Sequence, residues 1–385
     1  MDAAQYFGGP NALTFSAYFS GVMQISQSIA SISFQLLKRE GEMKRIPWVK
    51  HPVYNLLHTM ANPWCDALKW RETAQMQCIN WGNSYSQIVR DSAYRPKEAY
   101  LLEPDRMRMD LKDSGEPVYI YRRKVGGERV FAYDEIFHLR GFGPDVYTGY
   151  SVIELHRGAL ALGLQQQEFS NAFIENGVHT SGVATHPGVI SENAHTRLTK
   201  SLNDTHAGGR NAGKVLIFEE GMTFQPMTMP LKDAEFLGSK VFQIQEVARI
   251  LNMPPHKLKD LSHATFSNIE HQQIEYVTDT IRPWAERWER AVDTQLLTAQ
   301  ERDQQGFFSQ HEMNQLMRGD MKTTAETQQI GRYAGLLTGD EGRFGLGLNP
   351  MEDPKIGKRY WQPVNMIDAS SPQAAGIVTE EVDAQ

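Results

Sequence analysis

The segment Gly208–Val215 comes close to a nucleotide-binding motif. Its sequence, GGRNAGKV, has the glycines and the lysine of the phosphate-binding loop G-x-x-x-x-G-K. That loop needs a serine or threonine after the lysine to hold magnesium, and Val215 cannot do so. A phosphate-binding loop also follows a strand and opens a helix, whereas here a helix is predicted before the segment and a strand after it. The sequence therefore predicts a turn at this position and no nucleotide hydrolysis.

A second pair of residues has the spacing of metal ligands. His271 and Glu275 lie four positions apart on a predicted helix, which would place both on one face. No further ligand follows at a recognisable distance and the neighbours are glutamines, so a solvated or intersubunit face is the favoured interpretation. The alternative is a metal-dependent DNA-processing enzyme, for instance a nuclease that uses His263, Glu270 and His271. Since no motif of a serine hydrolase or a zinc protease occurs, we predict no catalytic residue, no metal and no cofactor.

The charge balance points away from a protein that grips nucleic acid. The 385 residues include 39 lysines and arginines against 46 aspartates and glutamates, a net charge of −7, which is the wrong sign for tight binding of a polyanion. Cys65 and Cys78 give no disulfide framework and suit a reducing cytosol. No signal peptide is recognised, and no apolar run reaches the roughly 18–20 residues that cross a bilayer. We expect a soluble chain, intracellular when it is made, with no membrane partner.

The most informative part of the sequence is a polar loop between two helices, within residues 242–299. The first helix should end near Asn252, because Pro254 and Pro255 disfavour helical geometry and lack donors. Ser267, with Glu270 three residues later, is a capping box that predicts the start of a longer helix. Pro283 removes the donor for a carbonyl four residues earlier, so we expect the longer helix to bend there. The loop carries basic and polar side chains, namely His256, Lys257, Lys259, Asp260, Ser262 and His263.

Helical and strand patterns are mixed along the rest of the chain, which predicts an α+β protein. Apolar residues recur with helical spacing in 14–37, 64–79 and 153–176. Short β-like runs are separated by turn signals such as Gly126-Gly127; they are 85–89, 99–102, 118–121, 130–133 and 136–139.

Residues 178–230 predict a compact insertion between two long helices. Ser191 can cap a short helix in it. Residues 215–218 and 222–224 are expected to pair as a hairpin. Further helices are expected around 311–337, and the acidic end of the chain is predicted to be disordered.

Short sequence words occur in a fixed order along the chain. They are Ala248-Arg249-Ile250, Pro254-Pro255-His256, Ser267-Asn268-Ile269-Glu270 and Ile281-Arg282-Pro283-Trp284, with Gly82-Asn83-Ser84-Tyr85 and Gly149-Tyr150-Ser151-Val152-Ile153 before them and Leu348-Asn349-Pro350 after them. In this order and spacing they resemble the portal proteins of tailed bacteriophages, in the family of lambda-like long-tailed phages. The resemblance covers roughly residues 12–367.

The resemblance implies a portal fold that assembles as a ring around a central channel. Its regions would be a wing (1–152), a first stem helix (153–176), a clip (177–230), a second stem helix (231–252), a tunnel loop (253–267), a long kinked wing helix (268–300), a C-terminal crown region (301–367) and a disordered acidic tail (368–385). Rings of this family normally hold twelve subunits. We therefore expect a homo-oligomer at one vertex of a virion capsid, made in the host bacterial cytoplasm.

The resemblance also implies a role in DNA packaging and ejection. The tunnel loop would contact the passing double-stranded DNA without sequence preference, with Lys257 and Lys259 touching phosphates. The expected protein partners are the terminase large subunit, the major capsid or scaffolding protein and a head-completion adaptor. Candidate clip contacts are Glu192, Arg197, Lys200, Glu219 and Glu220. Besides the enzyme, the remaining alternative is a non-viral oligomeric scaffold that forms no channel.

Overall fold

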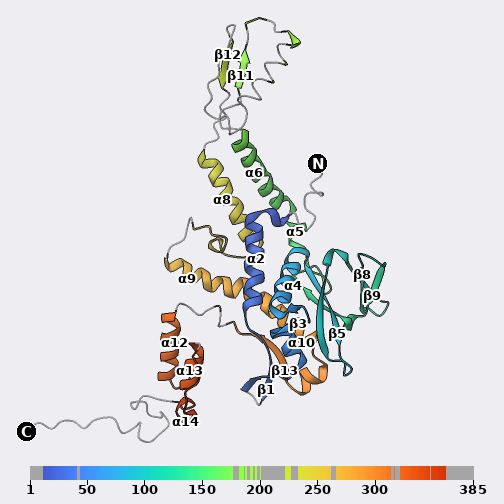
Figure 1. The fold of residues 1–385 in the computed structure, drawn as a ribbon, viewed down its shortest axis with the longest axis vertical. Helices are drawn as coiled ribbons and strands as arrows, with labels where there is room; N and C mark the ends of the chain where they lie inside the picture. The colour runs from blue at the N-terminus through green and yellow to red at the C-terminus, as the bar shows by residue number, and fades with distance from the viewer. Residues whose placement is uncertain are drawn as a thin grey trace, which may run out of the picture. The chain divides into compact units, whose positions relative to one another are not determined.

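The computed structural model divides the chain into two compact units, Met1–Met313 and Asn314–Gln385 (Figure 1). Each unit is described by itself. The residues that the structure describes are 12–40, 44–176, 182–185, 187–188, 191–193, 196, 200, 222–226, 233–261, 266–313, 316, 321–346 and 348–360.

Two packed helices form the centre of the first unit. Helix α2 (Ser16–Ser31) lies against α4 (Ala67–Trp81), and its buried face includes Tyr18, Val22, Ile25 and Ile29. The spacing of these four residues is that of one helical face. The expectation of a helix through 14–37 was wrong at its end, because the chain leaves the helix after Ser31 and becomes strand β1.

Helix α4 is positioned by its two ends. Asp66 caps the first turn by accepting from the backbone N–H of Lys69 at 2.7 Å. Gly82 ends the helix with a left-handed φ of 74°, and a Cβ there would collide with the backbone oxygen of Gly149. Glycine is therefore required at this position both by conformation and by space.

Three antiparallel sheets of three strands surround the helices. Their strand orders are β13-β1-β2, β10-β5-β6 and β7-β8-β9. Strands β3 and β4 form a separate two-stranded pair. The bounds are β1 Phe34–Glu40, β2 Lys44–Pro47, β3 Met60–Asn62, β4 Cys65–Asp66, β5 Asn83–Arg90, β6 Pro96–Leu102, β7 Met107–Leu111, β8 Pro117–Arg122, β9 Glu128–Phe131, β10 Ile136–Arg140 and β13 Phe307–His311.

All five predicted β-like runs lie in or overlap strands β5, β6, β8, β9 and β10. Strand β13 was not predicted, and it pairs Phe34 of β1 with His311. Residues 301–313, which the resemblance assigned to the crown region, therefore belong to the first unit.

An aromatic cluster packs the helix α10 (Arg282–Gln295) against α4 and strand β1. The Trp288 ring makes edge contacts with the rings of Trp70 at 5.5 Å and Phe34 at 6.4 Å. Its indole N–H donates to Gln75 Oε1 at 2.9 Å, and the indole of Trp70 donates to Ser86 Oγ at 2.9 Å. Each aromatic pair adds about 0.5–1.5 kcal/mol beyond area burial, and the buried indoles are not left without acceptors.

A further pair of helices carries the insertion. Helix α5 (Val152–Leu155) is separated by His156 from α6 (Arg157–Asn176), and α6 packs on α8 (Asp233–Ile250). Between them the described residues include β11 (Gly182–Thr185), which pairs with β12 (Thr223–Pro226) (Figure 1). Strand β12 contains most of the predicted segment 222–224, but its described partner is β11. The expected partner, 215–218, lies outside the described residues, as does Gly208–Val215 with its near-miss phosphate motif.

Shorter elements complete the first unit. They are the single turns η1 (Ala12–Thr14), η2 (Pro104–Arg106), η3 (Tyr133–Glu135) and η5 (Pro255–Leu258), helix α3 (Pro52–His58), helix α9 (Phe266–Glu275), and the π-helical turns η6 (Tyr276–Ile281) and η7 (Gln300–Gln304). No helix in the described ranges is long and apolar enough to span a membrane.

The described part of the second unit contains short helices. They are α12 (Met321–Tyr333), α13 (Gly339–Gly345) and α14 (Pro354–Gly357). Thr338 begins α13 with a capping box: its hydroxyl accepts from the N–H of Glu341 at 3.2 Å, and the Glu341 carboxylate accepts from the N–H of Thr338 at 2.8 Å. The predicted tail, 368–385, lies outside the described residues.

Candidate functional site

The loop predicted from the double proline begins with a left-handed residue. Helix α8 ends at Ile250, and Asn252 takes a φ of 51°, which asparagine tolerates better than most residues. Pro254 is extended, and Pro255 opens the single turn η5. That turn ends at Lys259, which is also left-handed with a φ of 66°. Helix α8 thus ends before the two prolines, and the left-handed residues Asn252 and Lys259 redirect the chain on either side of them.

The apolar residues of this loop are packed against α2. Leu251, Met253 and Leu258 are buried and lie around Gly21. A Cβ at Gly21 would collide with Leu251 and would lie 3.2 Å from the sulfur of Met253. Residues 251–258 therefore pack directly against α2, because Gly21 has no side chain at the point of contact.

The side chain of Lys257 contacts helix α9 and the turn η6. Its ammonium lies 4.6 Å from the centre of the Tyr276 ring and donates to Gln273 Oε1, and the Tyr276 hydroxyl is 3.1 Å from the hydroxyl of Ser28. Burial, and then the nearby charge of Lys259, lowers the pKa of Lys257. In this conformation the ammonium of Lys257 serves as an anchor, and the exposed Lys259 is the one of the two predicted phosphate contacts that faces solvent.

The other loop residues differ in their surroundings. His256 is half-buried, and its pKa is lowered by burial and then by Lys257, so the imidazole is neutral at physiological pH. The backbone N–H of Asp260 donates to Pro255 O at 3.3 Å. Ser262 and His263 lie outside the described residues.

A widened turn precedes Pro283, the position at which a bend was predicted. Helices α9 and α10 are joined by the π-helical turn η6, in which the N–H of Arg282 donates five residues back to Val277 O. Proline has no N–H, and its ring crowds the carbonyl four residues earlier. The wider turn accommodates this crowding. The capping-box interpretation was wrong in position, because α9 begins at Phe266 and Ser267 lies inside it.

Two hydrogen bonds join the end of α8 to this widened turn. In a regular α-helix the carbonyl of Asp279 would accept from the N–H of residue 283, which proline lacks. Here it accepts from Asn252 Nδ2 at 3.0 Å. The hydroxyl of Thr280 donates in the opposite direction to the carbonyl of Asn252. We call Asn252, Asp279 and Thr280 the junction clasp.

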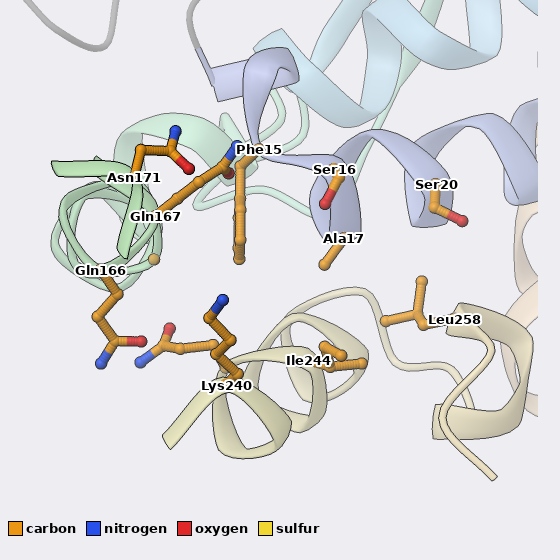
Figure 2. A pocket seen from close by; sticks show the side chains of 12 residues that line it. Phe15, Ser16, Ala17, Ser20, Gln166, Gln167, Asn171, Lys240, Ile244 and Leu258 are labelled. Atoms are coloured by element: carbon orange, nitrogen blue, oxygen red, sulfur yellow. The ribbon is translucent and has the colours of Figure 1, made fainter. Parts of the chain in front are cut away.

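A cleft of about 440 Å³ lies beside the loop, between α2, α6 and α8 (Figure 2). Figure 2 shows Phe15 and Lys240 reaching into it from opposite sides, and Leu258 of the loop lines it as well. Gly163 permits the packing of Phe15, since a Cβ there would lie 2.7 Å from the ring. Lys240 is the one charged residue in a lining otherwise made of amide, hydroxyl and apolar groups, so this cleft supplies no acid–base pair.

The comparisons with known proteins decide the family. The family model described as "Phage portal protein" matches residues 16–347. The chain belongs to this family. Its relatives include the portal protein of Enterobacteria phage HK97, 28% identical over 83% of this chain and 75% of that protein. Another is the probable portal protein of Streptomyces phage phiC31, 26% identical over 92% of this chain and 79% of that one.

Solved structures agree with the family at the level of fold. A chain from the neck of an empty GTA particle has a TM-score of 0.61 and 23% identity over 90% of this portal protein and 92% of that chain. An HK97 family phage portal protein from Corynebacterium diphtheriae has a TM-score of 0.58 and 13% identity, over 81% and 97% of the two chains. The predicted family and the mixed α+β portal fold are thereby confirmed.

The remaining predicted residues of this portal protein are not members of the junction clasp. Glu192 and Lys200 are exposed, whereas Arg197, Glu219 and Glu220 lie outside the described residues. His271 and Glu275 are both exposed. The described part of the chain holds no group of three residues that could bind a metal ion. His263, one of the three residues of the nuclease alternative, lies outside the described residues.

The clasp was missed from sequence. Asn252 carried a signal, because asparagine just beyond a helix end favours the left-handed conformation. The carbonyl left without a donor by Pro283 was also deducible. That these two groups meet depends on how α8 crosses the long helix, which no local pattern encodes.

Proposed function

We propose that this portal protein forms a ring at one capsid vertex, through which double-stranded DNA is packaged and later ejected. The observation that carries the proposal is the family match over residues 16–347. A structurally similar chain comes from the neck of a native GTA particle computed with C12 symmetry, with a TM-score of 0.58. We propose the same subunit number, twelve, for this chain. Such a ring would carry a net charge of about −84, from −7 per chain, which would keep DNA from adhering to the channel wall.

The fold supports a division of labour within the proposed ring. We propose that α6 and α8 are the stem, residues 177–230 the clip, residues 1–152 with 268–300 the wing, and the C-terminal region from 314 onward the crown. The support is the packing of α6 on α8 and the separate compact unit that begins at Asn314.

We propose that the loop 253–267 contacts the passing DNA through Lys259. Lys259 is exposed, while Lys257 is bound to Gln273 and Tyr276. A single exposed lysine per subunit touches phosphate weakly, which suits a conduit, because each neutralised phosphate adds affinity and would slow translocation. In this division Lys257 and the junction clasp hold the loop in place.

We assign the proposed protein partners to the same regions of the chain. The clip, with Glu192 and Lys200 exposed, would contact the terminase large subunit during packaging and a head-completion adaptor afterwards. The wing would meet the major capsid or scaffolding protein. We propose a location at the portal vertex of the virion, after synthesis in the host cytoplasm.

A packaging assay tests the loop assignment directly. The variant Lys259→Glu should still form rings but should retain less DNA in the particle. Glu192→Lys should form rings and load DNA poorly, because its defect would lie in motor docking. Rings of Lys259→Glu that package normally would remove the proposed phosphate contact.

A further inference from the structure

Two adjoining hollows on the first unit are lined by arginines. One, of about 500 Å³, lies between β10 and α10; the other, of about 240 Å³, lies between α10 and the sheet that contains β1, β2 and β13. Both are lined by Arg290. The arginines that line them form what we call the arginine track: Arg39, Arg45, Arg140, Arg287 and Arg290.

The acidic residues in these hollows already have partners. Glu289 accepts from the N–H of His311 at 2.8 Å and lies 3.1 Å from its ring nitrogen. Asp293 accepts from the N–H and the hydroxyl of Ser309, both at 2.7 Å. Glu286, at the rim, pairs with Arg282 at 2.9 Å. These carboxylates have partners outside the track, and Asp293 also lies within electrostatic reach of Arg290.

The arginines make no ion pair within the described ranges. Arg39 and Arg45 lie over the Phe308 ring at 5.0 and 5.9 Å. Arg287 and Arg140 donate to the backbone oxygens of Gly141 and Val146 at 3.3 and 3.0 Å. Guanidinium groups with spare donors match carboxylates and phosphates in a bidentate manner. The track is thus a positive surface prepared for an anion, in a chain whose net charge is −7.

We infer that the arginine track binds carboxylates of a second copy of this chain and so forms one side of the contact between neighbouring subunits. This inference rests on the proposed ring, in which each subunit must present two different faces to its neighbours. The chain itself supplies the complementary charge. Glu286, Glu289 and Asp293 line the hollows together with the five track arginines. Outside these residues the chain has 34 basic residues against 43 acidic ones, so the rest of the chain is acidic on balance.

DNA is the less favoured ligand for the track. Arginines bind the phosphate backbone strongly and their contacts add up, which would hold DNA in place during translocation. The track is also concave, and a carboxylate on a side chain can enter a hollow that the wide surface of a duplex cannot. A contact between subunits needs this kind of fixed, specific charge pairing.

The test reverses the charge of two exposed arginines of the track in the full chain. Arg45→Glu with Arg290→Glu is compared with a matched control, Arg108→Glu with Arg122→Glu, which changes two exposed arginines on β7 and β8 by the same charge. Ring assembly is followed by mass photometry over a range of protein and salt concentrations. We expect the track variant to need more than about tenfold higher concentration to assemble, and the control to assemble like the wild type.

A footprint on the wild type makes the result independent of folding in the variant. Phenylglyoxal modifies accessible arginines, and peptide mass spectrometry reads each position. Arg45 and Arg290 should be protected in the ring and modified in the dissociated chain, while Arg108 should be modified in both.

The other outcomes overturn the inference. Normal assembly of the track variant, or unprotected track arginines in the ring, rejects the subunit contact. If the track variant forms rings but loses binding to a duplex oligonucleotide, DNA is the ligand instead. A wild-type chain that never forms a ring contradicts the proposed function itself, and this result is read without any variant.

Discussion

Removing the Asn252 side chain should destabilise the protein more when Pro283 is present than when alanine replaces it. Asn252→Gly keeps the left-handed backbone, which glycine tolerates, and deletes the donor to the Asp279 carbonyl, 3.0 Å away. One such hydrogen bond contributes about 0.5–1.5 kcal/mol. In a Pro283→Ala background residue 283 regains its N–H, which can serve the same carbonyl. Asn252→Gly should then cost much less.

The experiment is a double-mutant cycle on urea unfolding, followed by tryptophan fluorescence; the chain has seven tryptophans, two of them in α10. The backbone effect of glycine is common to both backgrounds and cancels in the cycle, so the coupling energy isolates the hydrogen bond. We expect a coupling of about 1 kcal/mol. Thr280→Val, which deletes the other half of the clasp, should also destabilise. Thr278→Val is its control, since the Thr278 hydroxyl bonds only within its own helix.

Equal losses in the two backgrounds would refute this reasoning. A coupling below about 0.3–0.5 kcal/mol is what unconnected residues give, and it would mean that Pro283 does not create the acceptor that Asn252 satisfies.

Three further predictions concern a lysine pair, a glycine and the histidines. Lys257→Gln should lower the thermal midpoint, because it loses the contact with Tyr276, worth about 0.5–2 kcal/mol. Lys259→Gln, at an exposed position, should change stability by less than about 0.5 kcal/mol. A larger loss for Lys259→Gln than for Lys257→Gln would contradict the anchor role of Lys257. Gly82→Ala should lower the free energy of unfolding by at least about 2 kcal/mol, because the strain of the left-handed conformation and the collision with Gly149 add together. Gly115 is also left-handed but has open space around it, so Gly115→Ala should cost about 1 kcal/mol. Equal urea midpoints for the two variants would exclude the collision. Burial, followed by Arg140, lowers the pKa of His138, and burial lowers the pKa values of His311 and His256. The unfolded chain therefore takes up protons first as the pH falls below about 6.5. The thermal midpoint should fall from pH 7 towards pH 5 and should fall less steeply in His138→Gln; a midpoint independent of pH would contradict this.

The sequence predicted those parts of the fold that depend on local pattern. Helix α4 (Ala67–Trp81) overlaps the helix expected through 64–79. Strands β8 to β10 overlap β-like runs predicted between turn signals such as Gly126-Gly127. Leu36 was assigned to a helix because a short apolar run fits either period. Its strand pairs with β13, which comes from the other end of the first unit.

The site was predicted in outline and missed in its contacts. Helix α8 ends just before Pro254 and Pro255, and a π-helical turn precedes Pro283. That these prolines act as helix stop and kink stays a prediction from the geometry of proline. The anchoring of Lys257 depends on Gln273 and Tyr276 lying beside the loop, and the clasp depends on Asn252 reaching Asp279. These are tertiary contacts, and a residue's type and spacing do not name its partner.

Imaging of the purified full-length chain tests the central claim most directly. Negative-stain microscopy, combined with mass photometry, should show rings with an axial hole and a mass of about 520 kDa for twelve chains of 43.7 kDa. A chain that remains a monomer or dimer at every protein and salt concentration would contradict the account.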